Sequence, residues 1–109
     1  MAIKSFEEYK NGDKFVNESR ATSRERLLKI LRDKYPDAWF KKGENFDSEY
    51  EGSIWTGEGS MDDGIPLFDV YGPSSLYELG VYKELADLLD KHGWYAEQYD
   101  AGTFFLYKI

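Results

Sequence analysis

The chain has 109 residues, of which 41% are hydrophobic and 17% aromatic, and its formal net charge at pH 7 is −7. This length is typical of one domain with a single core, and the aromatic share predicts that Tyr, Phe and Trp rings fill much of that core. The absence of cysteine excludes a disulfide framework, a thiol nucleophile and a thiolate metal site. No apolar run reaches the length of a transmembrane helix and no apolar signal core begins the chain, so we expect a soluble, cytoplasmic protein without membrane contacts.

The charge is divided unequally along the chain. Residues 1–35 hold nine Lys and Arg against six acids, whereas residues 36–109 hold five against fifteen. Proteins that bind nucleic acid need a basic surface to displace the counterions of the phosphates. Most of this chain would repel phosphate, and we therefore expect no direct binding to nucleic acid.

Two helices are predicted in the first third of the chain. A short helical turn is expected at residues 5–10, followed by a turn at Asn11 and Gly12, with Phe6, Tyr9, Phe15 and Val16 as apolar anchors. The first main helix is expected at residues 23–35, because Thr22 and Glu25 have capping-box spacing, an apolar stripe follows, and Pro36 ends it. The outer face of this helix is basic, with Arg24, Arg26, Lys29, Arg32 and Lys34.

In the middle of the chain the sequence predicts strands separated by loops. Short strands are predicted at residues 38–41, 49–56 and 65–71, the last of them interrupted by Pro66 near its start. A glycine-rich loop at residues 57–64 and a second loop at residues 72–75 separate these segments.

The last third predicts a helix and a hairpin. The helix ends at His92, where Gly93 suits a left-handed residue after the cap, and it begins nearer Val81 than Ser75 because Gly80 weakens a longer first turn. Residues 94–99 and 103–108 form the hairpin, and its second strand is apolar on both faces, as in a central strand.

Together these elements predict an α+β fold: a single domain over residues 1–109, with an antiparallel sheet of four to five strands and two main helices.

The most unusual stretch is residues 43–82. It contains no Lys, Arg or His, but nine carboxylates, seven aromatic residues and seven of the chain's ten glycines. Unopposed like charge repels itself unless another segment or a partner supplies cations, while the aromatic content favours an ordered structure. We interpret the stretch as a folded acidic and aromatic surface that the basic helix either neutralises or leaves exposed.

Little in the sequence points to catalysis. A Ser–His–acid arrangement would need His92, the only histidine, and its place at a helix end favours a capping role. Glu58, Asp62, Asp63 and Asp69 offer hard oxygen ligands in or beside a glycine-rich loop, but their spacing is not that of an EF-hand. An ordinary solvated acidic loop is favoured, and no cofactor is expected.

Two patches of sequence resemble small acidic accessory proteins of tailed bacteriophages. The first combines residues 54–59 (Ile-Trp-Thr-Gly-Glu-Gly) with residues 66–69 (Pro-Leu-Phe-Asp), and the second covers residues 92–97 and 101–103. The resemblance covers about the last sixty residues and is tied to no named activity. It implies a setting in a host bacterium, in which small acidic proteins bind and block host enzymes or defence complexes. The basic first third lies outside the resemblance and departs from the pattern of a pure nucleic-acid mimic.

These observations lead to one main hypothesis and two alternatives. The main hypothesis is a non-enzymatic inhibitor or modulator of a host nucleic-acid-handling or defence protein that has a basic surface. The residues expected to bind the partner are Tyr50, Trp55, Glu58, Asp62, Asp63, Asp69 and Tyr71. The alternatives are a divalent-metal-dependent hydrolase that uses the loop from Glu58 to Asp69 and a structural phage component. The sequence does not indicate the oligomeric state.

Overall fold

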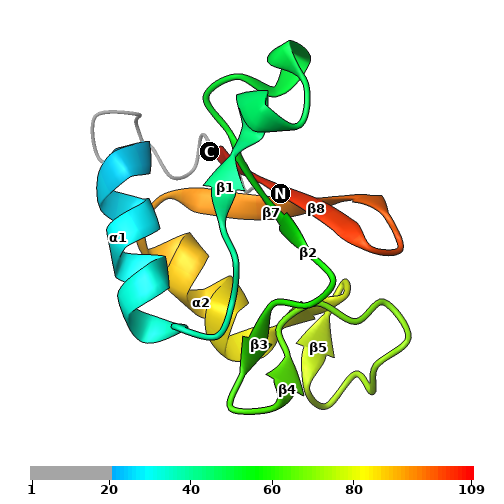
Figure 1. Ribbon diagram of the computed structural model, residues 1–109. Coiled ribbons are helices and arrows are strands. Elements are labelled where there is room, and N and C mark those ends of the chain that lie inside the picture. The colour runs from blue at the N-terminus through cyan, green and yellow to red at the C-terminus, as the bar shows by residue number, and fades with distance from the viewer. Residues whose placement is uncertain (1–20) are drawn as a thin grey trace, which may run out of the picture.

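The computed structural model describes residues 21–109, which form a four-stranded antiparallel sheet, two α-helices and two small hairpins (Figure 1). The predicted α+β fold class is confirmed. The helical turn expected at residues 5–10 and the anchors Phe6, Tyr9, Phe15 and Val16 lie outside the described residues.

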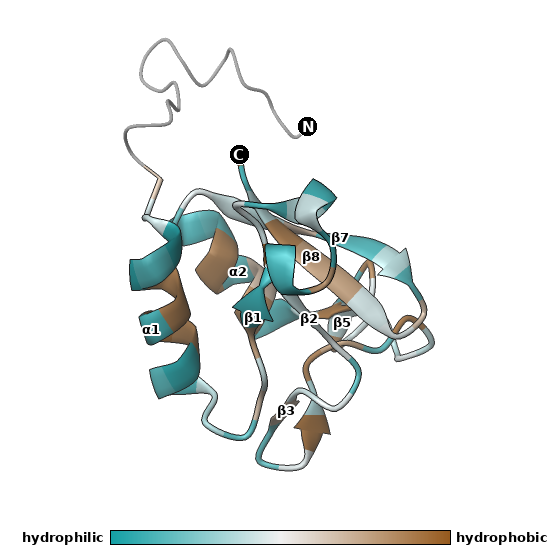
Figure 2. Ribbon diagram, turned by 45° about the horizontal axis from the view of Figure 1, so that its top comes forward, coloured by the Kyte–Doolittle hydropathy of each residue, from teal (hydrophilic) through white to brown (hydrophobic). Residues whose placement is uncertain are grey.

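The spatial order of the main sheet is β1-β2-β8-β7. Its strands are β1 (Lys41–Lys42), β2 (Ile54–Gly57), β7 (Trp94–Asp100) and β8 (Thr103–Lys108). The predicted C-terminal hairpin is therefore correct, and its second strand is central, as its two apolar faces require. Figure 2 shows β8 as a mainly hydrophobic strand within the sheet.

Helix α1 (Arg24–Lys34) buries Leu27, Leu28 and Leu31. Its N-cap is Ser23, whose hydroxyl accepts a hydrogen bond from the Arg26 N–H at 3.2 Å. The expected cap at Thr22 is wrong, because the Thr22 hydroxyl lies 2.8 Å from His92 Nδ1 and joins the start of α1 to the end of α2.

Helix α2 (Lys83–Lys91) begins late, as Gly80 suggested, because Gly80 lies in the turn of a hairpin between β5 (Tyr77–Glu78) and β6 (Val81–Tyr82). Its C-cap is His92, and Gly93 follows with a φ of +78°, which confirms the predicted helix end.

The hydrophobic core lies between the helices and one face of the sheet. The buried side chains that meet there include Leu31, Leu85, Ile54, Phe104 and Leu106. Because side chains alternate along a strand, the neighbours Trp55 and Phe105 point to the opposite, outer face of the sheet. Neither of the two α-helices of the described residues lies on that outer face (Figure 1).

The glycine-rich middle departs from the predicted strands. Residues 49–53 are not extended: they belong to the end of the 3₁₀ helix η3 (Ser48–Tyr50) and to the turn and bend after it. The Asp47 carboxylate accepts the Glu49 N–H and caps η3, and a first 3₁₀ helix, η2 (Gly43–Asn45), precedes it. The strand expected at residues 38–41 is reduced to β1, one residue further on. The strand expected at residues 65–71 is reduced to β4 (Ile65–Pro66) and an isolated bridge from Phe68 to Val81.

The loop expected at residues 57–64 contains a hairpin instead. Strands β3 (Met61–Asp62) and β4 pair across Asp63 and Gly64, whose φ angles are +55° and +86°. Positive φ at both central residues is the requirement of a type I′ turn, and Asp-Gly is one of its preferred dipeptides.

Candidate functional site

Five aromatic rings gather on the outer face of the sheet. We call Phe46, Tyr50, Trp55, Tyr99 and Phe105 the outer aromatic cluster. The rings come from η2–η3, β2, β7 and β8, so segments far apart in the chain build it. Tyr50 stacks on Phe105 with ring centroids 4.2 Å apart, and Phe46 meets both Trp55 and Phe105 edge-on at 5.2 Å.

The cluster has a buried centre and an exposed rim. Phe105 is 1% exposed, whereas Phe46 is 37% and Tyr99 is 53% exposed. Each favourable ring pair adds roughly 0.5–1.5 kcal/mol beyond simple burial, which holds η2–η3 on the sheet. Among residues 21–109 the rings on the rim are only partly covered.

Carboxylates lie beside the tyrosine hydroxyls of this face. Burial raises the pKa of Tyr50, and the charges of Glu49 and Asp47 raise it further. Burial together with Glu97 raises the pKa values of Tyr95 and Tyr107 in the same way. The hydroxyls therefore stay protonated at neutral pH and can act as hydrogen-bond donors next to fixed negative charge.

A second feature is a groove of about 500 Å³ at the end of β2 and β8, which we call the hairpin groove. Its lining residues are Glu58, Gly59, Met61, Pro66, Phe68, Asp69, Val70, Tyr71, Ala101 and Gly102. Backbone hydrogen bonds bring its walls together: the Glu58 N–H donates to Gly102 O at 2.9 Å, and the Asp69 N–H donates to Gly80 O at 2.8 Å. The Asp69 carboxylate accepts the Tyr71 N–H at 3.0 Å, which fixes a turn that leaves the Tyr71 side chain exposed.

The seven residues predicted to bind a partner do not form one patch. Glu58, Asp69 and Tyr71 line the hairpin groove, while Tyr50 and Trp55 belong to the outer aromatic cluster. Asp63 lies at the tip of the β3–β4 turn, and Asp62 is half-buried beside it.

Asp62 in β3 lies near enough to Tyr35 for its charge to act on that residue. The pKa of Tyr35 is raised mainly by burial and by its hydrogen bond to Glu84, and the charge of Asp62 adds to that effect. Because Asp62 is half-buried, it is a weaker candidate for contact with a partner than the exposed Asp63.

Trp39 connects the two surfaces, a role that the sequence analysis did not predict. Its indole N–H donates to Glu58 O at 2.9 Å, and its ring lies 5.3 Å from that of Trp55. Lys41 Nζ lies 5.4 Å from the centroids of both indole rings, as in a cation–π contact. Sequence reasoning also missed Phe46, Tyr99 and Phe105; the alternation of the last strand could have placed Phe105 on the outer face, but not the rings that cover it.

The basic face of α1 neutralises little of the acidic stretch. Arg24 donates to both carboxylate oxygens of Glu44, at 2.7 and 2.9 Å, and to Ser53 O at 3.0 Å. Lys29 pairs with Asp33 within the helix, and Lys34 lies 3.7 Å from Glu84. Among residues 21–109, Glu44 is the only one of the nine carboxylates in residues 43–82 that has an ion pair.

The residues considered for catalysis are His92 and the acids of the glycine-rich loop. Among residues 21–109 no three His, Cys, Asp or Glu side chains are grouped so as to hold a metal ion. The pKa of His92 is lowered by burial and by the nearby charges of Lys91 and Arg26, and its Nδ1 is occupied by Thr22. His92 is the C-cap residue of α2, as its position at a helix end suggested, and its ring also contacts Thr22 just before α1.

Comparisons with protein-family models, with curated proteins and with solved structures give no match for this chain. None of the helices in residues 21–109 has the length and apolarity needed to cross a membrane.

Proposed function

We propose that this is a non-enzymatic binding protein that recognises a basic surface on another protein through the hairpin groove and the outer aromatic cluster. The observation that carries the proposal is the combination of unpaired acids and exposed rings. Of the nine carboxylates in residues 43–82, only Glu44 has an ion pair among residues 21–109, and Tyr71, Tyr99 and Phe46 are exposed beside the others.

This combination is what a protein-binding surface needs. Large rings that are partly exposed supply contact area at a small cost in side-chain entropy, and they are frequent hot spots of binding energy. Fixed negative charge around them steers a basic partner towards the surface and disfavours acidic ones. Glu58 and Tyr71 provide one group of each kind within the same groove.

The proposed partner is a host protein that handles nucleic acid or serves in defence. Such proteins carry basic surfaces because they must bind phosphates, and an acidic, aromatic surface complements them. The resemblance to small acidic phage proteins supports the same choice. The protein would then act as an inhibitor or modulator that occupies the basic surface.

The proposal is tested by capture from a bacterial lysate on the immobilised full chain, followed by mass spectrometry and by affinity measurement with each captured protein. We expect a basic partner whose affinity falls as salt is raised. Tyr71→Ala should weaken the affinity about 30-fold, as expected for a hot-spot ring, and Glu58→Gln should mainly slow association. The matched control is Asp37→Asn, because Asp37 is an exposed acid outside both surfaces.

Two results would contradict the proposal. One is a captured partner whose affinity is the same for the Tyr71 and Glu58 variants as for the unchanged chain. The other is the absence of any partner whose binding depends on salt.

A further inference from the structure

Strand β7 lies at one edge of the main sheet, with no strand beyond it among residues 21–109. Its register with β8 shows which backbone groups face outwards. The Ile109 N–H donates to Gly93 O at 2.9 Å, so the first pair of the ladder, Gly93 with Ile109, is a hydrogen-bonded pair. Hydrogen-bonded and non-hydrogen-bonded pairs alternate in an antiparallel ladder. The backbone groups of Trp94, Ala96 and Gln98 therefore point away from β8.

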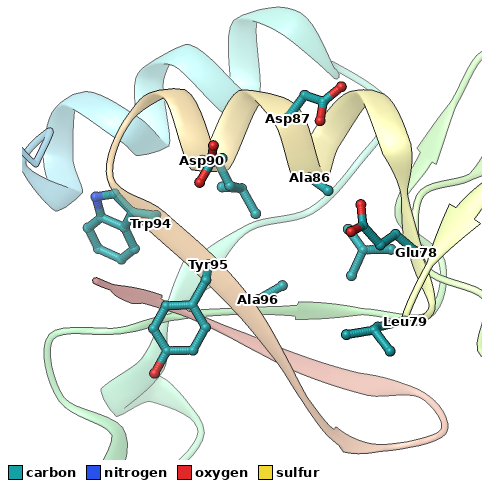
Figure 3. Close-up of a pocket in the computed structure, with 10 residues that line it drawn as sticks. Glu78, Leu79, Ala86, Asp87, Asp90, Trp94, Tyr95 and Ala96 are labelled. Carbon is teal, nitrogen blue, oxygen red and sulfur yellow. The ribbon is translucent and has the colours of Figure 1, made fainter. Parts of the chain in front are cut away.

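A groove of about 370 Å³ runs beside this open edge, between β7, α2 and the β5–β6 turn (Figure 3). We call it the edge groove. Its apolar lining comes from Leu79, Val81, Ala86, Leu89, Trp94, Tyr95 and Ala96, and its charged lining is Glu78, Asp87 and Asp90. Among residues 21–109 no cation lines it, so the charged groups of its described lining are all negative.

The turn that closes one end of the edge groove carries an exposed apolar side chain. Leu79 is 91% exposed and has a φ of +52°, a left-handed conformation that is unfavourable for a bulky residue. Figure 3 shows Leu79 next to Ala96 of β7, at the mouth of the groove. An apolar side chain held in solvent at this point offers a contact to any segment that lies along β7.

We propose that the β7 edge and the edge groove bind an extended, basic segment of a partner protein, which adds to the sheet as a strand next to β7. Backbone hydrogen bonds to Ala96 and Gln98 would hold the segment. Every second side chain of the segment would face the edge groove, where lysines would pack their aliphatic stems on Leu79 and Ala96 and place their ammonium groups near Glu78, Asp87 and Asp90.

Charge complementarity favours this occupant over a second copy of the chain. Strand β7 carries Glu97 and Asp100 and no cation, so pairing of two β7 strands would bring acids of one copy towards acids of the other, and like charges on paired strands are destabilising. A basic segment removes that repulsion. This site uses a different surface from the hairpin groove and the outer aromatic cluster, so it does not depend on the function proposed for them.

The test uses fluorescence anisotropy of the full chain with a labelled peptide of about eight residues that alternates lysine and valine, a length that matches a typical strand. We expect binding that weakens as salt is raised. Two control peptides should not bind: one that alternates glutamate and valine, and one with proline at alternate positions, which removes the backbone donors needed for strand addition. Amide hydrogen exchange should slow at Ala96 and Gln98 when the lysine peptide is bound.

Variants of the protein separate this site from non-specific attraction. Asp90→Lys should weaken binding of the lysine peptide by tenfold or more, while Asp37→Lys, with the same change in net charge, should weaken it only slightly. Leu79→Asn should weaken it several-fold. Ala96→Pro should abolish it, because proline removes the outward N–H, and Tyr71→Ala should leave it unchanged, because Tyr71 lies in the hairpin groove.

Three outcomes would overturn the inference. The first is no binding of the lysine peptide to the full chain. The second is equal weakening by Asp90→Lys and Asp37→Lys, which would show attraction to net charge alone. The third is self-association in sedimentation experiments that Ala96→Pro removes, which would make a second copy the occupant of the edge.

Discussion

Two turns of this protein have the same backbone form but different residues at the first central position. Asp63 and Leu79 each have a φ near +55° and are each followed by a glycine with positive φ, in the β3–β4 and β5–β6 hairpins. Asp tolerates this conformation because its short polar side chain bonds locally, whereas leucine gains nothing in return. At Leu79 the fold therefore carries both backbone strain and an exposed apolar side chain.

Replacement of Leu79 should relieve that strain. We expect Leu79→Asn to raise the free energy of unfolding by about 1 kcal/mol, because Asn accepts the left-handed conformation and no buried contact is lost. Urea denaturation measures this, with a raised midpoint and an unchanged slope. Leu76→Asn is the control, since Leu76 is also exposed but has no positive φ. A lowered midpoint for Leu79→Asn would show that the leucine side chain stabilises the fold.

Among residues 21–109, Glu44 is the one carboxylate of the acidic stretch that forms an ion pair with α1, and we expect this ion pair to lower its pKa. The hydrogen bonds from Arg24 to Glu44 are the main cause that lowers the pKa of Glu44 from 4.5 to about 2. Because the folded-state pKa lies below the unfolded value, the pair stabilises the fold above pH 4.5, and this contribution is lost as the pH falls towards 2.

Carbon-13 NMR of the side-chain carboxyl groups measures the pKa of Glu44 and so tests the ion pair with Arg24. Glu44 should titrate near pH 2 in the unchanged chain and at a clearly higher pH in Arg24→Gln, where backbone hydrogen bonds alone still lower its pKa. Lys29→Gln should leave the pKa of Glu44 where it is, since Lys29 pairs with Asp33. A Glu44 resonance that titrates above pH 4 in the unchanged chain would show that the ion pair does not form in solution.

At the scale of elements, the segment from β1 to β2 folds back over the outer face of the sheet. Gly43 fixes the start of this segment: its N–H donates to Ser53 O at 2.9 Å, and its carbonyl accepts the N–H groups of Phe46 and Asp47. A Cβ at this position would collide with Tyr50 O and Ser53 Oγ. The segment can therefore cover Phe105 only because residue 43 has no side chain.

Gly43→Ala should loosen η2–η3 from the sheet. The collision with a backbone carbonyl cannot be removed by a change of rotamer, so we expect a loss of about 1–3 kcal/mol of stability, as for overpacked core sites. Chemical denaturation measures the loss, and a red shift of tryptophan emission would report exposure of Trp55. Glu51→Ala is the control in the same segment, because Glu51 is exposed. An unchanged denaturation midpoint for Gly43→Ala would contradict this prediction, because it would show that η2–η3 accommodates the added Cβ without loss of stability.

Across the whole molecule, negative charge is spread over several surfaces rather than gathered in one. The hairpin groove and the edge groove contain different carboxylates, and the acids near the outer aromatic cluster form a third group. The capture and peptide experiments address different surfaces of the same chain. A basic partner with both a folded surface and an extended segment could contact more than one of them.

The residues predicted to bind a partner lie on different surfaces of the fold. Glu58, Asp69 and Tyr71 line the hairpin groove, whereas Tyr50 and Trp55 belong to the outer aromatic cluster. Asp62 is half-buried in β3 and does not line the hairpin groove. A charge pattern along a chain does not contain the direction in which each side chain points.

The local signals of the sequence determined both main helices, the end of α2 at Gly93, the C-terminal hairpin and the α+β class. Helix stripes, a proline stop, a left-handed glycine and alternation in a strand act over a few residues, so they can be read without knowledge of the fold. The tertiary structure alone decided that Thr22 binds His92 rather than capping α1, and that Tyr50 stacks on Phe105 instead of extending β2. It also decided that Arg24 reaches one carboxylate while the others stay free of ion pairs among residues 21–109. These outcomes depend on contacts between residues far apart in the chain, whose energies local propensity does not include.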